Sequence, residues 1–160
     1  MCEGIPHARW ALENAYHITL SFLGDVPRHR MGDVLEIARS IRAPFFDLQL
    51  EGAGVFPHRG QPRVLWVGVR KEERLLSFQR TLQNELRHGD FDLERRKYHP
   101  HVTLARIDTS PREPLSEWLG HHLTFRSDAF PVRRFHLFSS DLSRRGSRHV
   151  LQESFSLPRL

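Results

Sequence analysis

One short pattern occurs twice in this chain and constrains the fold more than any other feature. The stretches YHITLSFLGD, residues 16 to 25, and HPHVTLARID, residues 99 to 108, each contain histidine, any residue, threonine and leucine in that order. Residues 16–22 alternate between apolar and polar side chains, which predicts a strand with one buried face. The second copy predicts an equivalent strand over residues 99–107. We therefore expect an internal duplication within a single bilobal domain, residues 1–160.

Other apolar patterns predict the remaining helices and strands. Apolar residues at helical spacing predict helices at 31–41, 75–86 and 115–119. Apolar or alternating runs predict strands at 46–50, 63–69, 123–125, 135–139 and 150–155, with a hairpin turn at 143–148. When the two halves are aligned on the repeated motif, the second copy has a strand and a helix before it and the first copy has neither. We expect that first strand-helix unit to be missing.

The charge of the chain indicates a polyanionic partner. The chain has 24 basic and 19 acidic residues, a net charge of +5, and only two of the basic residues are lysine. Because the planar guanidinium of arginine suits phosphate oxygens, we expect a nucleic acid or another phosphate ligand. The alternative is that the arginine content reflects codon usage alone.

Several features favour a cytoplasmic protein. The N-terminal segment lacks a basic start followed by an apolar stretch, so we expect no secretory signal. Apolar runs fall far short of the ~20 residues that a membrane-spanning helix needs, so we expect no membrane association. Cys2 is the only cysteine, which excludes an internal disulfide and fits a reducing compartment.

The repeated motif has the side chains that phosphodiester cleavage requires. Residues i and i+2 of a strand share a face, so His17 lies beside Thr19 and His101 beside Thr103. One histidine can act as a base and the other as an acid near neutral pH. The threonine hydroxyls can hold phosphate oxygens, and Arg106 can add positive charge if a bulge or strand end brings it to the same face. The alternative is a polar face without function, which is the usual meaning of a single copy.

The eleven histidines raise the question of a metal site. His99 and His101 flank a proline, and His121 and His122 are adjacent. Zinc sites usually take three or four ligands, and neither pair has an acidic or cysteine residue at ligand spacing. We expect no metal and no cofactor.

Two aromatic residues are candidates for stacking an RNA base. Phe56 and Tyr98 lie near the motif strands in the sequence, and stacking on an aromatic ring contributes roughly 1 to 3 kcal/mol per base. Packing in the core is the alternative for each of them.

Four longer stretches carry a resemblance to a known family. RWALENAYHITLSFLGDV, GVFPHRGQPRVLWVGV, HPHVTLAR and HLFSSDLSRRGSRHVL resemble the 2H phosphoesterases, which are named for two His-x-Thr/Ser motifs. Within that superfamily they are similar to the RNA 2′,3′-cyclic phosphodiesterases, historically called 2′-5′ RNA ligases. The resemblance covers most of residues 9–155.

The resemblance implies a fold and a reaction. The fold is α+β and bilobal, with two antiparallel sheets facing each other across a central cleft and helices outside. The family normally begins with a strand and a helix, and here they are absent. The reaction is metal-independent hydrolysis of an RNA 2′,3′-cyclic phosphate, or of a cyclic nucleotide, to a 2′-phosphomonoester. The same chemistry in reverse gives 2′-5′ ligation.

The resemblance also implies a role for each motif residue. His17 is the proton donor to the departing 3′ oxygen and His101 is the proton acceptor that activates water. Thr19, Thr103 and Arg106 bind phosphate.

We expect a monomer. The other hypothesis is an RNA-end-binding module with little or no turnover, against which the two intact His and Thr pairs argue.

Overall fold

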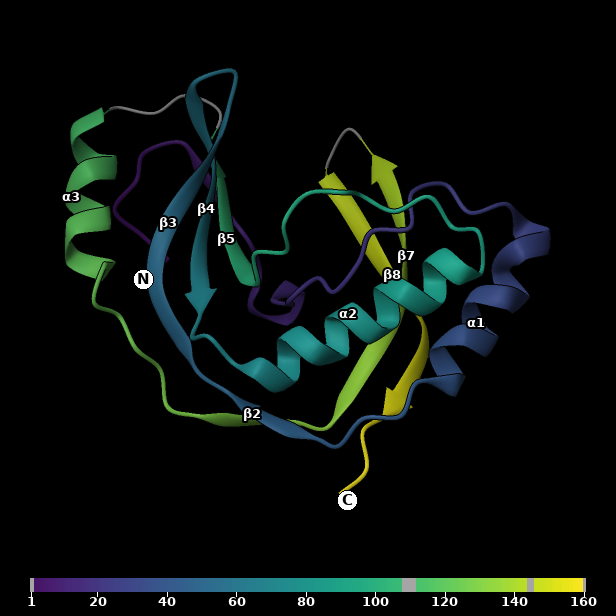
Figure 1. Ribbon diagram of the computed structural model, residues 1–160. Coiled ribbons are helices and arrows are strands. Elements are labelled where there is room, and N and C mark those ends of the chain that lie inside the picture. The colour runs from purple at the N-terminus through teal and green to yellow at the C-terminus, as the bar shows by residue number, and fades with distance from the viewer. Residues whose placement is uncertain (1, 108–111, 144–145, 160) are drawn as a thin grey trace. The chain divides into compact units, whose positions relative to one another are not determined.

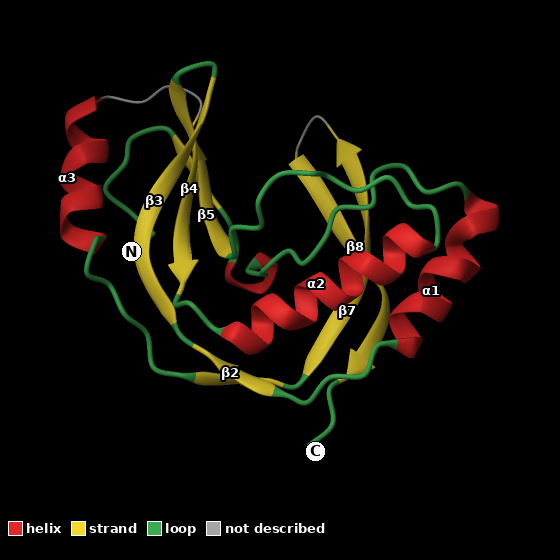
Figure 2. Cartoon of the chain, in the orientation of Figure 1, coloured by secondary structure: helices red, strands yellow, loops and turns green. Residues whose placement is uncertain are grey.

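The computed structural model describes residues 2–107, 112–143 and 146–159, and the chain divides into two compact units (Figures 1 and 2). Each unit is assembled from three segments that alternate along the sequence. The first unit contains Met1–Leu20, Leu48–Lys71 and Lys97–Phe130. The second unit contains Ser21–Asp47, Glu72–Arg96 and Pro131–Leu160.

The first unit is an antiparallel sheet with a helix on one face. The strands are β1 (Ala8–Trp10), β3 (Leu50–His58), β4 (Gln61–Val69) and β5 (His101–Ile107), in the spatial order β1-β5-β4-β3. Helix α3 (Arg112–His122) lies along one face of this sheet (Figure 1), and a 3-10 turn (Glu13–Ala15) follows β1.

The face of the sheet beneath α3 forms the core of the first unit. Leu65 and Val67 of β4 and Ile107 of β5 are almost fully buried. They belong to one apolar cluster with Leu115 and Trp118 of α3. Since side chains alternate along a strand, burial of this face leaves polar residues of β5 on the opposite face.

The second unit combines two helices with a long hairpin. Helices α1 (Met31–Ser40) and α2 (Glu73–His88) pack side by side after a 3-10 turn (Arg28–Arg30), and β7 (Arg134–Ser143) pairs with β8 (Gly146–Ser156) (Figure 1). The Phe135 ring lies 5.1 Å from that of Phe78 on α2 and stacks on Phe155 at 4.8 Å. This apolar contact joins α2 to the hairpin.

Two short strands lie where the chain passes from one unit to the other. Strand β2 (Phe46–Leu48) pairs with β6 (Phe130–Val132). The chain passes from the second unit to the first between Asp47 and Leu48 of β2, and back to the second between Phe130 and Pro131 of β6.

Most of the predicted elements are present. The three predicted helices correspond to α1, α2 and α3. None of the helices in the described part of the chain is long and apolar enough to cross a membrane. The predicted hairpin turn joins β7 to β8, whose last pair is Ser143 with Gly146; residues 144–145 lie outside the described part. The α+β class with antiparallel sheets is confirmed.

Four strand predictions were wrong in whole or part. The predicted strand at 46–50 is divided at Gln49 between the end of β2 and the start of β3. Residues 16–22 do not form a strand: only Ile18 makes a bridge, and Phe22 is 65% exposed. Alternation predicts a buried face but cannot supply a neighbouring strand, and here a neighbour exists only at Ile18. The second motif strand begins at His101 rather than at residue 99, and residues 123–125 form a turn after α3.

A glycine in β3 provides the space for a tryptophan of β4. Gly54 is paired with Trp66, and a Cβ at Gly54 would overlap Cζ2 of the indole and lie 2.6 Å from Cη2. We predict that Gly54→Ala lowers the free energy of unfolding by about 1–3 kcal/mol, the usual cost of overpacking. Chemical denaturation measures this value.

The control is Gly120→Ala on α3, where an added Cβ would meet nothing within 4 Å. Alanine is favoured over glycine inside a helix, so this variant should be as stable as the parent or up to about 1 kcal/mol more stable. Equal stability of Gly54→Ala and Gly120→Ala would contradict the overlap at Trp66.

Candidate active site

The two copies of the motif lie next to each other in the first unit. Ile18 and Val102 form an antiparallel bridge. In this register His17 lies opposite Thr103 and Thr19 lies opposite His101. Directly opposed side chains have Cβ atoms about 4.5–5.5 Å apart. Two imidazoles and two hydroxyls are therefore gathered in one small area.

The bridge also separates an apolar side from a polar side. Val102 is 7% exposed within the core cluster, and Ile18 packs against that cluster. His101 and Thr103 lie on the other face of β5, where both are half-buried, and His17 is exposed. The predicted arrangement of one buried and one polar face is confirmed for the second copy. In the first copy exposure does not alternate from residue to residue, so its polar face stays a prediction.

Both motif histidines have the same anchor. The Nδ1 of His17 lies 2.8 Å from the carbonyl oxygen of Ala15, and the Nδ1 of His101 lies 2.7 Å from that of His99. A carbonyl oxygen only accepts, so Nδ1 carries the hydrogen in each ring and donates it. Nε2 is then the nitrogen that can take up or deliver a proton. This anchor lies two residues before each histidine and cannot be recognised from the His-x-Thr pattern itself.

A β-bulge brings Arg106 onto the polar face. Across β4 and β5, Leu65 is opposite Ala105 and Trp66 is opposite Thr103, which leaves Leu104 as an extra residue. Leu104 and Ala105 are consequently both buried, and Arg106 is exposed. The sequence analysis required a bulge or strand end to place Arg106 with Thr103, and the structure has the bulge.

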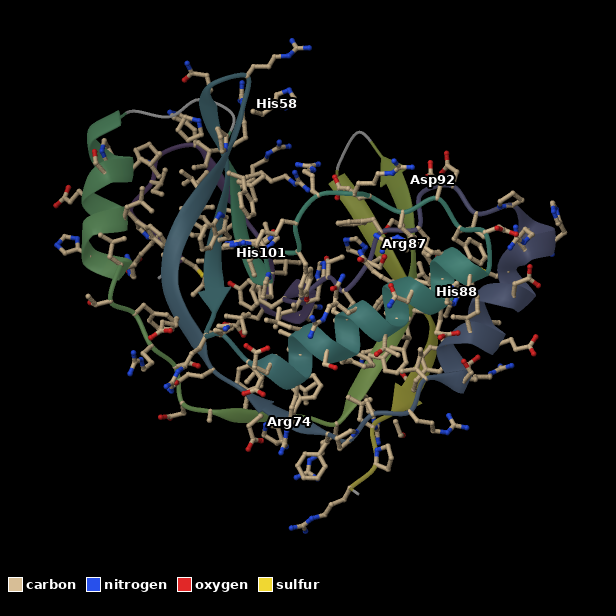
Figure 3. All side chains as sticks on the ribbon, in the orientation of Figure 1. His58, Arg74, Arg87, His88, Asp92 and His101 are labelled. Atoms are coloured by element: carbon tan, nitrogen blue, oxygen red, sulfur yellow. The ribbon has the colours of Figure 1, made fainter. Side chains whose placement is uncertain are left out.

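An aromatic cluster flanks His101 on the side of β3 and β4. The His101 ring contacts Phe56 edge-on at 4.8 Å, and Phe56 lies 5.2 Å from Trp66. The Trp66 ring also contacts His99 at 4.9 Å. Sequence reasoning proposed Phe56 and missed Trp66, although Trp66 alternates with the buried Leu65 and Val67 and so had to lie on the polar face. Figure 3 labels His101 at the start of β5.

Tyr98, the other predicted stacking residue, is held differently. Its hydroxyl is buried, and burial raises the pKa of this phenol above its ordinary value. A stacking role for Tyr98 stays a prediction.

Burial lowers the pKa of His101 below the ordinary histidine value. The hydrogen bond to the His99 carbonyl opposes this shift, and the charges of His99 and His17 add to it. A histidine with a lowered pKa is neutral over a wider pH range, which suits a general base. The lowered pKa therefore favours His101 as the base, an assignment that the motif alone does not give.

Residues considered for a metal site have other contacts. His122 donates from Nδ1 to the Trp118 carbonyl at 2.7 Å and stacks on the Trp118 ring at 4.2 Å. Within the described ranges, no group of three or more His, Cys, Asp or Glu side chains is placed to hold a metal ion. The absence of a metal from the reaction stays a prediction.

A cavity borders the site on its apolar side. Ile18, Val102 and Leu104 line it together with Leu50 and Phe125, and Cys2, Tyr16 and His17 also border it. The motif residues and their neighbours offer two imidazole Nε2 atoms for proton transfer, two hydroxyls and one guanidinium for an anion, and an aromatic surface alongside. These groups suit the cleavage of a phosphate ester that carries an aromatic base.

Comparison with known proteins agrees with this geometry. The 2'-5' RNA ligase superfamily matches residues 6–144, a span that contains both motifs. The chain therefore belongs to the 2'-5' RNA ligase superfamily, a group of 2H phosphoesterases.

Curated relatives have similar sequences. An RNA 2',3'-cyclic phosphodiesterase of Thermotoga maritima is 35% identical over 141 residues, which cover 87% of this chain and 74% of that protein. The protein of the same name from Aquifex aeolicus is 29% identical over 153 residues, covering 93% of this chain and 81% of the relative.

Solved structures share the fold. The protein TT0787 of Thermus thermophilus superposes with a TM-score of 0.78 at 25% identity, covering 96% of this chain and 84% of that one. Escherichia coli LigT complexed with 3'-AMP gives a TM-score of 0.75 at 25% identity, covering 94% and 82%.

We predict that the pKa of His101 lies below the ordinary histidine value. Phe56→Ala should raise this pKa, because removing the Phe56 ring exposes the imidazole to water. NMR titration of the histidine ring protons measures both values. Leu123→Ala removes an exposed apolar side chain after α3 and is the control, for which no change is expected. An unchanged His101 pKa in Phe56→Ala would show that the phenyl ring does not shield it.

Proposed function

We propose that this protein is an RNA 2′,3′-cyclic phosphodiesterase that opens the cyclic phosphate to a 2′-phosphomonoester. The observation that supports the proposal is the Ile18–Val102 bridge, which brings the two His-x-Thr copies side by side, each with its histidine Nδ1 donating to a backbone carbonyl. A cyclic phosphodiester needs one group to deprotonate water and another to protonate the leaving oxygen. The paired motif provides both.

The relatives support this substrate class. The curated relatives from Thermotoga maritima and Aquifex aeolicus are named RNA 2',3'-cyclic phosphodiesterase, so the proposal places this chain with phosphoric diester hydrolases. Structures of Escherichia coli LigT have been determined with 3'-AMP and with phosphate. These ligands are a nucleotide and the anion that the polar face here would hold.

The proposed reaction is a single displacement at phosphorus. Nε2 of neutral His101 takes a proton from water as the water oxygen bonds to phosphorus. The bond from phosphorus to the 3′ oxygen breaks, and protonated His17 delivers its Nε2 proton to that oxygen. The products are a 2′-phosphate and a 3′-hydroxyl, and proton exchange with solvent restores both rings. The lowered pKa of His101 supports its assignment as the base.

Thr19, Thr103 and Arg106 bind the phosphate in this proposal. The hydroxyls donate hydrogen bonds to the non-bridging oxygens, and the guanidinium balances the charge that develops as water attacks. Held in line by these groups, the phosphorus presents its 3′ oxygen to His17 and its opposite face to the water. The same displacement with the 5′-hydroxyl of another RNA chain in place of water gives a 2′-5′ phosphodiester and a free 3′-hydroxyl, which is the chemistry of 2′-5′ ligation.

The base of the terminal nucleotide is proposed to stack beside the phosphate site. Phe56 is half-buried at the edge of the His101 ring and is the better placed of the two predicted residues, since the hydroxyl of Tyr98 is enclosed by protein. We also propose that catalysis needs no metal and that the protein acts as a monomer in the cytoplasm, where RNA with cyclic phosphate ends is its substrate.

We predict that the protein converts adenosine 2′,3′-cyclic phosphate mainly to adenosine 2′-phosphate with EDTA present. Separation of the 2′ and 3′ isomers by chromatography gives the answer. Exclusive formation of the 3′-phosphate, or activity only after a metal is added, would contradict the proposed reaction. Binding of RNA ends without any product would favour the RNA-end-binding module instead.

We also predict that His17→Ala and His101→Ala each lower kcat by about 10² or more, as expected for loss of a general acid or base. His58→Ala, an exposed histidine at the end of β3 (Figure 3), is the matched control and should retain activity. Turnover at the parent rate in either motif variant would remove that histidine from the mechanism.

A further inference from the structure

Two arginines face each other on the polar side of the sheet. Strand β1 pairs with β5 so that Arg9 lies directly opposite Arg106. Both side chains are exposed. Ala8 and Trp10, on either side of Arg9, pack against the core cluster, and the Trp10 ring lies 6.2 Å from that of Trp118 on α3. Arg9 therefore points away from α3, to the same face as Arg106.

This pairing places two like charges together. Directly opposed residues on neighbouring strands have Cβ atoms about 4.5–5.5 Å apart, so both guanidiniums can reach one anion on this face. Phosphate suits them best, because each planar fork can donate two parallel hydrogen bonds to its oxygens.

The position of the pair shows which phosphate it suits. His101, Thr103 and Arg106 follow one another along β5, and Arg9 lies one strand further out, on the edge strand β1. Neighbouring strands are about 4.8 Å apart. A cyclic phosphate held by Thr103 and Arg106 would lie over β5, so Arg9 faces the neighbouring group of the substrate on the β1 side. Phe56 and Trp66 lie on the opposite side of β5, on β3 and β4.

We propose that Arg9, together with Arg106, binds the next phosphate of the RNA chain, on the 5′ side of the nucleotide that carries the cyclic phosphate. The inference rests on the proposed function and narrows its substrate: the preferred substrate has a 5′-phosphate or a further nucleotide, rather than being a cyclic nucleoside phosphate alone. Arg106 would then contact both the cyclic phosphate and the 5′-phosphate, and Arg9 would contact the 5′-phosphate alone.

The test compares two substrates that differ only in the 5′-phosphate. Adenosine 2′,3′-cyclic phosphate is assayed beside its 5′-phosphorylated form, and the ratio of their kcat/KM values is measured. The parent protein should prefer the 5′-phosphorylated substrate by roughly tenfold or more, the lower end of the range for one charge-assisted hydrogen-bonded contact. Arg9→Gln should lose this preference, and Arg9→Lys should keep part of it.

Arg126→Gln is the matched control. It removes the same charge from the first unit, at a guanidinium that is already paired with Glu51, and should leave the preference as in the parent. With a short single-stranded RNA ending in a cyclic phosphate, Arg9→Gln should also reduce the slope of log KM against log salt by about 0.7, the value for one lost phosphate contact. A preference retained in Arg9→Gln, or absent from the parent, would overturn the proposal.

A binding measurement separates this proposal from the proposed function. Dissociation constants are measured for adenosine 2′-phosphate and adenosine 2′,5′-bisphosphate, neither of which can be hydrolysed by opening a cyclic phosphate. Tighter binding of the bisphosphate by the parent but not by Arg9→Gln supports the Arg9 contact even if no cyclic phosphate is turned over. Equal effects of Arg9→Gln on both ligands would refute it even if the enzyme is fully active.

Discussion

The antiparallel contact between Ile18 and Val102 is the interaction on which the candidate site depends. It is a single bridge rather than a ladder, so packing of the two apolar side chains against the core of the first unit must hold it. Side chains alternate along both segments, and a slip of one residue would turn His17 and Thr19 toward the core and Ile18 toward the site. The same pair of apolar residues thus determines both the register of the two segments and the placement of the motif side chains.

Two irregularities of the sheet complete the polar face around that contact. The bulge at Leu104 changes the alternation of β5, so that Arg106 follows Thr103 on one side. Gly54 leaves a space that the Trp66 indole occupies, and the indole in turn contacts His99, whose carbonyl accepts the hydrogen bond from His101. A regular sheet with a side chain at every position would offer neither the charge nor this aromatic support. The polar face therefore depends on features that weaken ordinary strand pairing.

The sequence predicted the side chains of the candidate site better than it predicted which segments pair with each other. The spacing of His17 and Thr19, repeated at His101 and Thr103, sufficed to assign which side chains share a face, because that follows from backbone geometry within one segment. The strand at 16–22 could not be judged in this way, since a strand exists only where another segment offers its backbone groups. The bulge was required by the position of Arg106 but could not be located, and Trp66 and Arg9 became visible only through their partners across the sheet. Strand pairing involves two segments that are far apart in the chain, so it cannot be read from the pattern of either segment alone.

The alternation of segments between the two units has a consequence for how the protein is made. Every residue of the candidate site precedes residue 131, so all segments of the first unit are synthesised before the last segment of the second unit. The second unit needs Pro131–Leu160, because the hairpin that packs against α2 lies there. At about 5–20 residues per second, residues 131–160 take a few seconds to synthesise, and for that interval Phe78 and its apolar neighbours on α2 lack the hairpin. The order of the segments along the chain therefore leaves the apolar side of α2 without its partner until the hairpin follows it.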